Sequence, residues 1–398
     1  MRSLNATVSP LLLDAINTHV EKEGLSHETL ARAVAELSRL FTKGRADLSR
    51  LYLEDTTSAA AYLQYFLPVN LCKIQVLLDE LPDETFLEKE ARRFSVLDLG
   101  AGPGTAGLAV LDWLHHGRRT LAEHLSVMAI DISGMALRQA ERLWNMYARM
   151  AGITSSRLQT QQADLRRIHS GSLREQIERA GPFDLIILGN CLNEMWSESP
   201  DQTTARAGLL TTALSWLSPH GTLMIVEPAL RGTSRELHQV RDQLLAEKRC
   251  TVYSPCLHEK GCPALLNMDD WCHEERAWEP PASIMQIDRE VGFIKDALKF
   301  SYLLLRTDGR TITPRSPETF RMVSELRKLK GDTRAWLCNE LGRCEVGRLD
   351  RAKKTDMNSA WDECQRGTIV RIEHITRKDG ASLGRIPDRS TVHIVRFV

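Results

Sequence analysis

The sequence lacks any apolar run that approaches the roughly 20 residues needed to cross a membrane, so no membrane partner is expected. Its first residues lack the charge pattern of a secretory signal and carry acidic residues early, and they show no clear mitochondrial transit segment. The chain also lacks net charge, because 52 lysines and arginines balance 52 aspartates and glutamates. These absences predict a cytoplasmic protein of bacterial type.

Familiar metal-binding cysteine patterns are missing as well. The chain has nine cysteines but neither a C-x2-C zinc ribbon nor the C-x3-C-x2-C run of radical enzymes. Thiols stay reduced inside cells, so we expect buried, catalytic or metal-bound cysteines and no disulfide-linked partner.

The 398 residues are 42% hydrophobic and 26% charged, which is typical of a globular chain with more than one domain. Residues 1–90 show apolar residues at helical spacing and are predicted to form a helical region. Ser26 is a predicted N-cap, with Glu28 in the first turn, and Pro68 is expected to break or restart a helix.

Residues 91–310 alternate between short apolar runs and helical stretches. The runs RFSVLDLG, LSVMAIDIS, FDLIILGN and GTLMIVEP predict a parallel sheet covered on both faces, and LKFSYLLLRT predicts a late strand that returns to it. A cysteine-rich loop at 250–275 interrupts this region. Residues 311–398 contain turns and short β-like runs, which predict a small β domain. The expected fold class is therefore α/β, with a Rossmann-like sheet between a helical region and a β domain.

The segment VLDLGAGPGTAG predicts a cofactor loop. Asp98 ends a strand, and Gly100, Gly102 and Gly104 precede a helix that begins near Thr105. Glycines allow a tight turn in which backbone amides approach a ligand closely. The G-x-G-x-G spacing differs from the G-x-G-x-x-G of dinucleotide binders, and the acidic Asp98 would repel a pyrophosphate. It suits the amino group of the methionine moiety of S-adenosylmethionine.

Three further polar residues stand at predicted strand ends, where open α/β sheets bind their ligands. Asp131 is expected to accept the ribose hydroxyls, Asp164 to hold the adenine amino group, and Asn190 to face the crevice. The predicted cofactor-binding residues are Asp98, Gly100, Ala101, Gly102, Gly104, Thr105, Asp131, Ile132, Asp164, Leu165 and Asn190.

With these motifs, residues 90–310 resemble the class I S-adenosylmethionine-dependent methyltransferases. The fourth strand end reads GNCLNEM and differs from the Asn/Asp/Ser-Pro-Pro-aromatic stretch of the aminomethylases. Cys191 is expected to be a packing residue, and no side chain is identified as the catalytic base. The catalytic residues are therefore unknown at this stage.

Cys256, Cys262 and Cys272 lie within seventeen residues, on a loop shaped by Gly261 and Pro263. Such a group predicts either a tetrahedral Zn²⁺ site or a [4Fe–4S] cluster, each with four ligands. The candidates for the fourth ligand are Cys250, Cys338, Cys344, His258 and His273.

The segments SPCLHEKGCP, DDWCHEE, LKFSYLLL and LCNELG, together with LDLGAGPGTA and AAYLQYFLP, resemble one family along most of the chain. It comprises the methyltransferase-like assembly factors of the mitochondrial small ribosomal subunit and their bacterial relatives. The resemblance implies a [4Fe–4S] cluster on Cys256, Cys262, Cys272 and Cys338. Zinc stays the alternative, and Cys344 or Cys250 the reserve ligand.

Residues 301–398 carry 20 basic against 13 acidic side chains, which favours a polyanionic partner such as RNA. The densest basic cluster, RLDRAKK, contains the candidate phosphate contacts Arg348, Arg351, Lys353 and Lys354. We therefore expect a protein that methylates or binds small-subunit ribosomal RNA during ribosome assembly. The alternatives are a non-catalytic RNA-binding assembly factor and a small-molecule methyltransferase with structural zinc.

Overall fold

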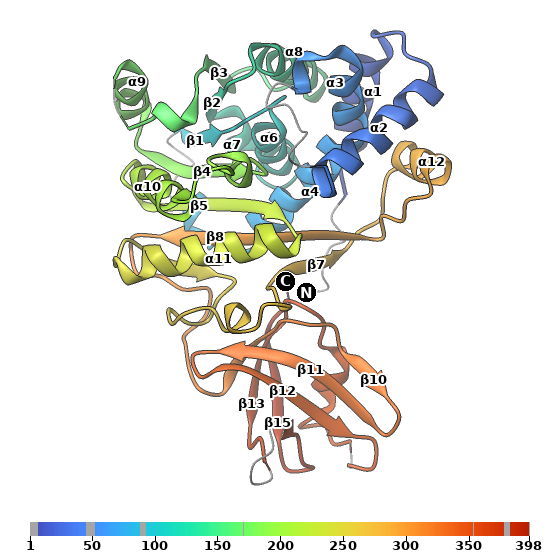
Figure 1. The fold of residues 1–398 in the computed structure, drawn as a ribbon, viewed down its shortest axis with the longest axis vertical. Coiled ribbons are helices and arrows are strands. Elements are labelled where there is room, and N and C mark those ends of the chain that lie inside the picture. Colours follow the sequence, from blue (N-terminus) through green and yellow to red (C-terminus); the bar gives the residue numbers. More distant parts are fainter. Residues whose placement is uncertain are drawn as a thin grey trace.

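The computed structural model describes residues 7–44, 52–87, 93–169, 171–352, 354–377 and 383–397. These residues form a large body around one sheet and a second, all-β part that lies beyond one edge of the body (Figure 1).

Eight strands form the sheet of the body. They are β1 (Phe94–Leu99), β2 (Leu125–Asp131), β3 (Arg157–Gln162), β4 (Phe183–Gly189), β5 (Leu217–Pro228), β6 (Thr251–Ser254), β7 (Glu274–Ala277) and β8 (Ala297–Arg306). Their order is β3-β2-β1-β4-β5-β8-β6, with β7 paired to β8. The first five strands pair in parallel, whereas β8 runs antiparallel to β5, β6 and β7. The predicted late strand therefore returns beside β5.

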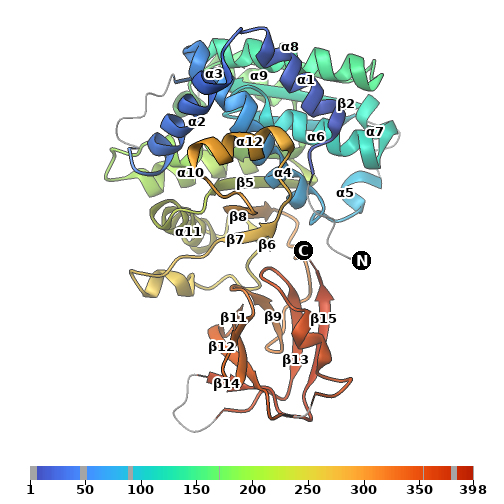
Figure 2. The ribbon, with the colours of Figure 1, turned by 90° about the vertical axis from the view of Figure 1, so that its right-hand side faces the viewer.

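Helices cover both faces of this sheet (Figure 1). They are α6 (Thr105–Gly117), α7 (Arg119–Glu123), α8 (Gly134–Ala151), α9 (Ser172–Ala180), α10 (Gln202–Leu214) and α11 (Arg231–Ala246), whereas α12 (Ala282–Val291) lies beside the N-terminal helices (Figure 2). Successive strand residues point to opposite faces. Val96 accordingly belongs to the core shared with α6 and α8, and Leu97 to the core shared with α10 and α11. The covered parallel sheet explains why its strands read as continuous apolar runs.

The N-terminal part is helical, as predicted. Its helices are α1 (Pro10–Glu21), α2 (His27–Thr42), α3 (Thr56–Ala61), α4 (Leu67–Leu78) and α5 (Glu84–Leu87). The Ser26 side chain caps α2 by accepting the Thr29 N–H over 3.2 Å, which confirms the predicted start. A π-helical turn, Tyr62–Phe66, joins α3 to α4, so Pro68 stands in the first turn of a restarted helix.

The C-terminal part forms a seven-stranded sheet (Figure 2). Its strands are β9 (Thr319–Met322), β10 (Arg327–Leu329), β11 (Asp332–Asn339), β12 (Gly342–Leu349), β13 (Ile369–Glu373), β14 (Leu383–Arg385) and β15 (Thr391–Arg396). Trp361 is fully buried in the small core of this sheet.

The fold-class prediction of an α/β protein is confirmed: the body is a Rossmann-like sheet with five parallel strands. The domain boundaries predicted at residues 90 and 310 stay predictions. Among the described helices, none is both long and apolar enough to cross a membrane.

Candidate functional site

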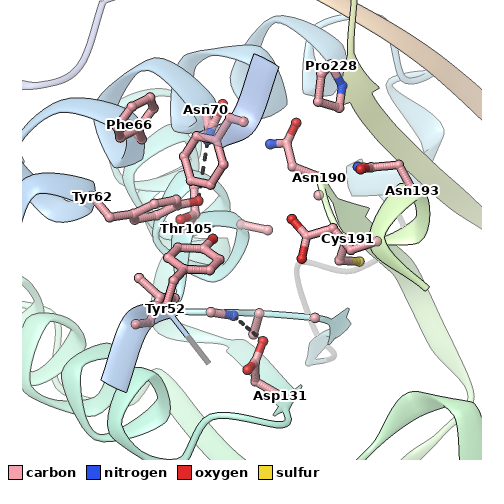
Figure 3. Close-up of a pocket in the computed structure, with 18 of the residues that line it drawn as sticks. Tyr52, Tyr62, Phe66, Asn70, Thr105, Asp131, Asn190, Cys191, Asn193 and Pro228 are labelled. Carbon is pink, nitrogen blue, oxygen red and sulfur yellow. Dashed lines mark hydrogen bonds between the residues drawn. The ribbon is translucent and has the colours of Figure 1, made fainter. Parts of the chain in front are cut away.

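The first candidate site, the cofactor cavity, has a volume of about 470 Å³ and lies at the carboxyl ends of the parallel strands (Figure 3). Volumes of about 300–1,000 Å³ are usual for small-molecule sites. Ten of the eleven predicted cofactor residues line the cavity; Gly104 does not. Gly104 instead packs its backbone against α8, where an added Cβ would stand 2.9 Å from the Ala140 Cβ.

Asp98 stands at the inner end of the glycine loop and is 1% exposed. Its Oδ2 accepts the Gly107 N–H over 3.2 Å. Burial raises the pKa of Asp98 to about 7, the Gly107 N–H lowers it, and the charge of Asp131 raises it further. A carboxylate in this setting gains from a cationic ligand, which agrees with its predicted role.

Asp131 joins the end of β2 to the glycine loop. Its Oδ2 accepts the Gly102 N–H and its Oδ1 accepts the Ser133 N–H, each over 2.8 Å. Burial raises the pKa of Asp131, and these backbone amides oppose that shift. The carboxylate is thereby held in one orientation at the wall of the cavity, where the ribose is expected.

The end of β4 presents Asn190 to the cavity, with the backbone in the left-handed region (φ 58°). The next residue, Cys191, packs against the glycine loop: an added Cβ on Gly100 would stand 2.6 Å from its Sγ. The Cys191 Sγ donates to the Leu99 carbonyl over 3.1 Å, and burial holds its pKa well above the usual value. This environment favours the predicted packing role over a nucleophilic one.

Asp164 and Leu165 line the cavity just beyond β3, but Asp164 is already engaged. Its Oδ1 accepts from the Arg166 Nε over 2.9 Å, and its Oδ2 also contacts the Arg166 guanidinium. The hydrogen bond to Arg166 lowers the pKa of Asp164. An adenine amino group would therefore share this carboxylate with Arg166, an arrangement that the sequence analysis did not anticipate.

The N-terminal helices supply a wall that the sequence analysis missed. Tyr52, Tyr62, Phe66, Asn70 and Lys73 all line the cavity (Figure 3 labels the first four). They come from the η2 turn (Tyr52–Glu54) and the α3–α4 segment, more than twenty residues before the glycine loop. The segment includes a π-helical turn, and such turns often lie at functional sites, but this turn is visible only in the folded structure.

Glu227, near the end of β5, is 1% exposed and contacts the side chain of Asn193. Its Oε1 accepts the Leu192 N–H over 3.0 Å. Burial raises the pKa of Glu227 to about 7, while its hydrogen bond to Asn193 lowers it. Glu227 thus positions the turn after β4, which carries Asn190 and Asn193 into the cavity.

A second, smaller cavity of about 40 Å³, the cysteine cavity, lies where the loop between β6 and β7 meets the C-terminal sheet. All four predicted ligands, Cys256, Cys262, Cys272 and Cys338, line it. Burial raises the pKa of the Cys256 thiol, whereas the neighbouring Arg241 guanidinium lowers it. The cavity exceeds the space that one water needs.

The reserve ligands are placed differently. Cys250 packs against the α10–α11 core and Cys344 against the C-terminal core, and neither lines the cysteine cavity. His258 and His273 do line it, and the His258 Nε2 lies 3.6 Å from the Cys338 Sγ. Across the described ranges, no group of three or more His, Cys, Asp or Glu side chains is arranged to hold a single metal ion.

A buried ion network borders the cysteine cavity and connects the C-terminal sheet to the body. The Arg321 guanidinium, from β9, donates to Glu274 over 3.0 Å and to the Tyr302 hydroxyl over 2.7 Å. Arg276 donates to Glu80 over 2.8 Å. Burial raises the pKa of Glu80, but Arg321 and Arg276 outweigh it and hold that pKa below its usual value.

The predicted basic cluster is only partly free to meet RNA. Arg348 is 9% exposed and bonds to Asn358 and Asp362, so it stabilises the fold. Lys354 is exposed and pairs with Asp362 over 2.9 Å. Arg351 is exposed, and Lys353 lies outside the described residues.

Several solved structures are weakly similar to this chain. An O-methyltransferase family protein from Burkholderia thailandensis is 16% identical (TM-score 0.32; 68% of this chain, 64% of that chain). NSun6 from Pyrococcus horikoshii with SFG is 17% identical, with a TM-score of 0.34, and the match covers 61% of this chain and 52% of that chain. The plantazolicin methyltransferase BpumL in complex with SAH is 13% identical, with a TM-score of 0.33, and the match covers 73% of this chain and 99% of that chain. The chain thus spans less than two thirds of the first two. Likenesses this weak carry no argument about ligands, and no curated protein matches.

The body therefore defines an α/β protein with a Rossmann-like sheet and a cavity at the expected strand ends. Within that class, the family model described as mitochondrial small ribosomal subunit Rsm22 matches residues 56–367. The chain belongs to the Rsm22 family. The resemblance inferred from the sequence is thereby confirmed, whereas the mitochondrial description of the family does not match the predicted cytoplasmic location.

Proposed function

We propose that this chain binds S-adenosylmethionine in the cofactor cavity, holds a [4Fe–4S] cluster in the cysteine cavity, and methylates or binds small-subunit ribosomal RNA during ribosome assembly. The observation that carries the proposal is the convergence of Cys256, Cys262, Cys272 and Cys338, from two distant segments, on one cavity. Membership of the Rsm22 family supports the ribosomal setting.

The cofactor part of the proposal is supported by the chemistry of the cavity wall. S-adenosylmethionine carries an ammonium group and ribose hydroxyls, and the buried carboxylate of Asp98 and the half-buried carboxylate of Asp131 suit these groups. When bound, the cofactor supplies an activated methyl group. The chain's own part is to orient it through the Asp98 carboxylate and the held Asp131 carboxylate, because the backbone amides of Gly100, Ala101, Gly102 and Gly104 already donate within the protein.

The donor set suits an iron–sulfur cluster. Four thiolates on one Zn²⁺, with Zn–S bonds of about 2.3 Å, would stand within roughly 3.8 Å of each other. No such group is found in the described parts of the chain. The ligands of a [4Fe–4S] cluster bind four different irons and are therefore spaced more widely. Four thiols around one cavity suit such a cluster, and the family resemblance favours it over zinc, which stays the alternative.

A non-catalytic RNA-binding factor is the second candidate, and the environment of Cys191 favours it. The Cys191 thiol donates to a backbone carbonyl, and its pKa is held well above the usual value, so it is a poor nucleophile. We identify no catalytic base beside Asn190. Transfer to RNA consequently requires a target atom that is itself nucleophilic or is activated by the RNA.

The test is to incubate the full chain with immature small-subunit RNA and methyl-labelled S-adenosylmethionine, and to measure binding and label transfer. RNA binding that weakens steeply with salt supports the proposal, because each neutralised phosphate releases counterions. Label in the RNA identifies an enzyme, and binding without label identifies the non-catalytic factor. Absence of RNA binding at low salt would overturn the RNA part.

A further inference from the structure

We propose that Lys73, Asn70 and Thr105 form an oxyanion-binding subsite in the cofactor cavity, and that its ligand is the carboxylate of a bound amino-acid moiety. The inference rests on the proposed function, because S-adenosylmethionine brings such a carboxylate into this cavity. It adds an anchor contributed by the N-terminal helices to the contacts predicted around the glycine loop.

Lys73 is the first indication of this subsite. Lys73 is 8% exposed and lines the cavity, and its ammonium group donates to the Asn70 Oδ1 over 2.9 Å. Among the described residues, no carboxylate lies within ion-pair distance of it. A buried cation with only a neutral partner is costly. An anion in the cavity would remove that cost.

Thr105 is the second, independent indication. It begins α6, is 9% exposed and lines the same cavity. The Tyr62 hydroxyl lies beside it, yet within the described structure the buried Thr105 hydroxyl has no hydrogen-bond partner of acceptable geometry. Buried polar groups are almost always satisfied. An acceptor from a ligand at this point would complete the hydrogen bonding of Thr105.

The position of the subsite suits an amino acid rather than an isolated anion. Figure 3 shows Asn70, Tyr62 and Thr105 gathered at one end of the cavity and Asp131 at another. Asp98 also lines the cavity, so a cation site and an anion site face the same space. A zwitterion that placed its ammonium against Asp98 and its carboxylate against Lys73 would neutralise both buried charges.

The surrounding charges make Lys73 responsive to such a ligand. The pKa of Lys73 is lowered to about 7, mainly by burial and also by the charge of Lys295, while the charge of Glu227 opposes the shift. The charges that act on Lys73 are those of Lys295, which lines the cavity, and Glu227, which lies behind its wall; the other charged groups that line the cavity are Asp98, Asp131, Asp164, Arg166, Glu194 and Lys299. A bound carboxylate stabilises the ammonium form, so binding draws a proton onto Lys73.

Calorimetry with two probes tests the subsite on the full chain. S-adenosylhomocysteine carries the amino-acid group, whereas 5′-methylthioadenosine has the same adenosine and thioether but lacks it. The Lys73→Met and Thr105→Val variants should each lose about 10- to 100-fold in affinity for S-adenosylhomocysteine. Both should bind 5′-methylthioadenosine like the wild type. Lys22→Met, exposed at the end of α1, is the matched control and should change neither affinity.

The outcomes separate the inference from the proposed function. Equal affinity of wild type and Lys73→Met for S-adenosylhomocysteine would overturn the subsite, and so would an equal loss for both probes. A variant that lost RNA affinity but kept S-adenosylhomocysteine affinity would show that the oxyanion is a phosphate, and would overturn the carboxylate assignment. A wild type that bound neither probe would refute the cofactor site itself.

Discussion

The backbone N–H of Gly102 donates to the Asp131 Oδ2 over 2.8 Å, and so ties the glycine loop after β1 to the end of β2. The same carboxylate accepts the Ser133 N–H. One side chain therefore both shapes the loop and presents the negative wall of the cofactor cavity. The first prediction concerns this double role.

Asp131→Asn should weaken S-adenosylhomocysteine binding by about 10- to 100-fold, because an amide cannot accept the two backbone hydrogen bonds and two ribose hydroxyls together. Calorimetry measures the change. Asp14→Asn, at an exposed position of α1 that does not line the cavity, is the matched control and should leave the affinity unchanged. An unaltered affinity in Asp131→Asn would contradict the proposed ribose contact.

The second prediction is a pH dependence that originates at Asp98. Its pKa is raised to about 7 by burial, so acidification below pH 7 protonates the carboxyl and removes the partner of the ligand's ammonium group. The affinity for S-adenosylhomocysteine should therefore fall as pH is lowered from 7 to 5, by up to tenfold per unit.

The affinity for 5′-methylthioadenosine, which has no ammonium group, should change little over the same range. Asp98→Asn should bind S-adenosylhomocysteine weakly at every pH and lose the dependence. A wild-type affinity that is constant between pH 5 and 7 would exclude Asp98 as the ammonium partner.

The third prediction separates the cysteines of the cysteine cavity from the others. Cys262→Ser should lose bound iron and solubility together, because metal binding contributes to folding. Cys250→Ser should keep its iron, since Cys250 does not line the cysteine cavity. Iron and sulfide assays on anaerobically purified variants measure this; equal iron in both variants would remove Cys262 from the ligand set.

The fourth prediction concerns the ion network between the two parts of the chain. Arg321→Met leaves the buried carboxylates of Glu274 and Glu80 with fewer partners and should lower the free energy of unfolding by about 3–5 kcal/mol. Arg371→Met, on neighbouring β13, breaks exposed pairs with Glu318 and Glu373 and should cost less than about 1 kcal/mol. Denaturant titration measures the free energy of unfolding of both variants. A cost for Arg321→Met as small as that expected for Arg371→Met would mean that the buried ion network does not stabilise the fold.

The sequence predicts the strand ends well, because each carries its polar residue locally. Asp98, Asp131 and Asn190 follow buried apolar runs, and parallel strands bring their carboxyl ends to one edge. The convergence of Cys338 with the cysteine loop came from the family resemblance, since the 65 residues between Cys272 and Cys338 contain no periodic signal that relates them.

Long-range packing explains what the sequence analysis missed. Lys73 and Asn70 lie in an apolar helical stretch, and only the placement of α4 against the glycine loop turns them toward the cavity. Arg348 stands in a basic run, but the fold buries it against Asn358 and Asp362. Neither outcome can be read from neighbouring residues, because each depends on a contact made by folding.

The most direct test of the proposed function is the absorption spectrum of the full chain purified without oxygen, with iron and sulfide counted. The arrangement of the four cysteines predicts a broad visible band and about four irons and four sulfides per chain. Colourless protein with about one zinc, or with no metal at all, would contradict the cluster and leave the cysteine cavity without its proposed role.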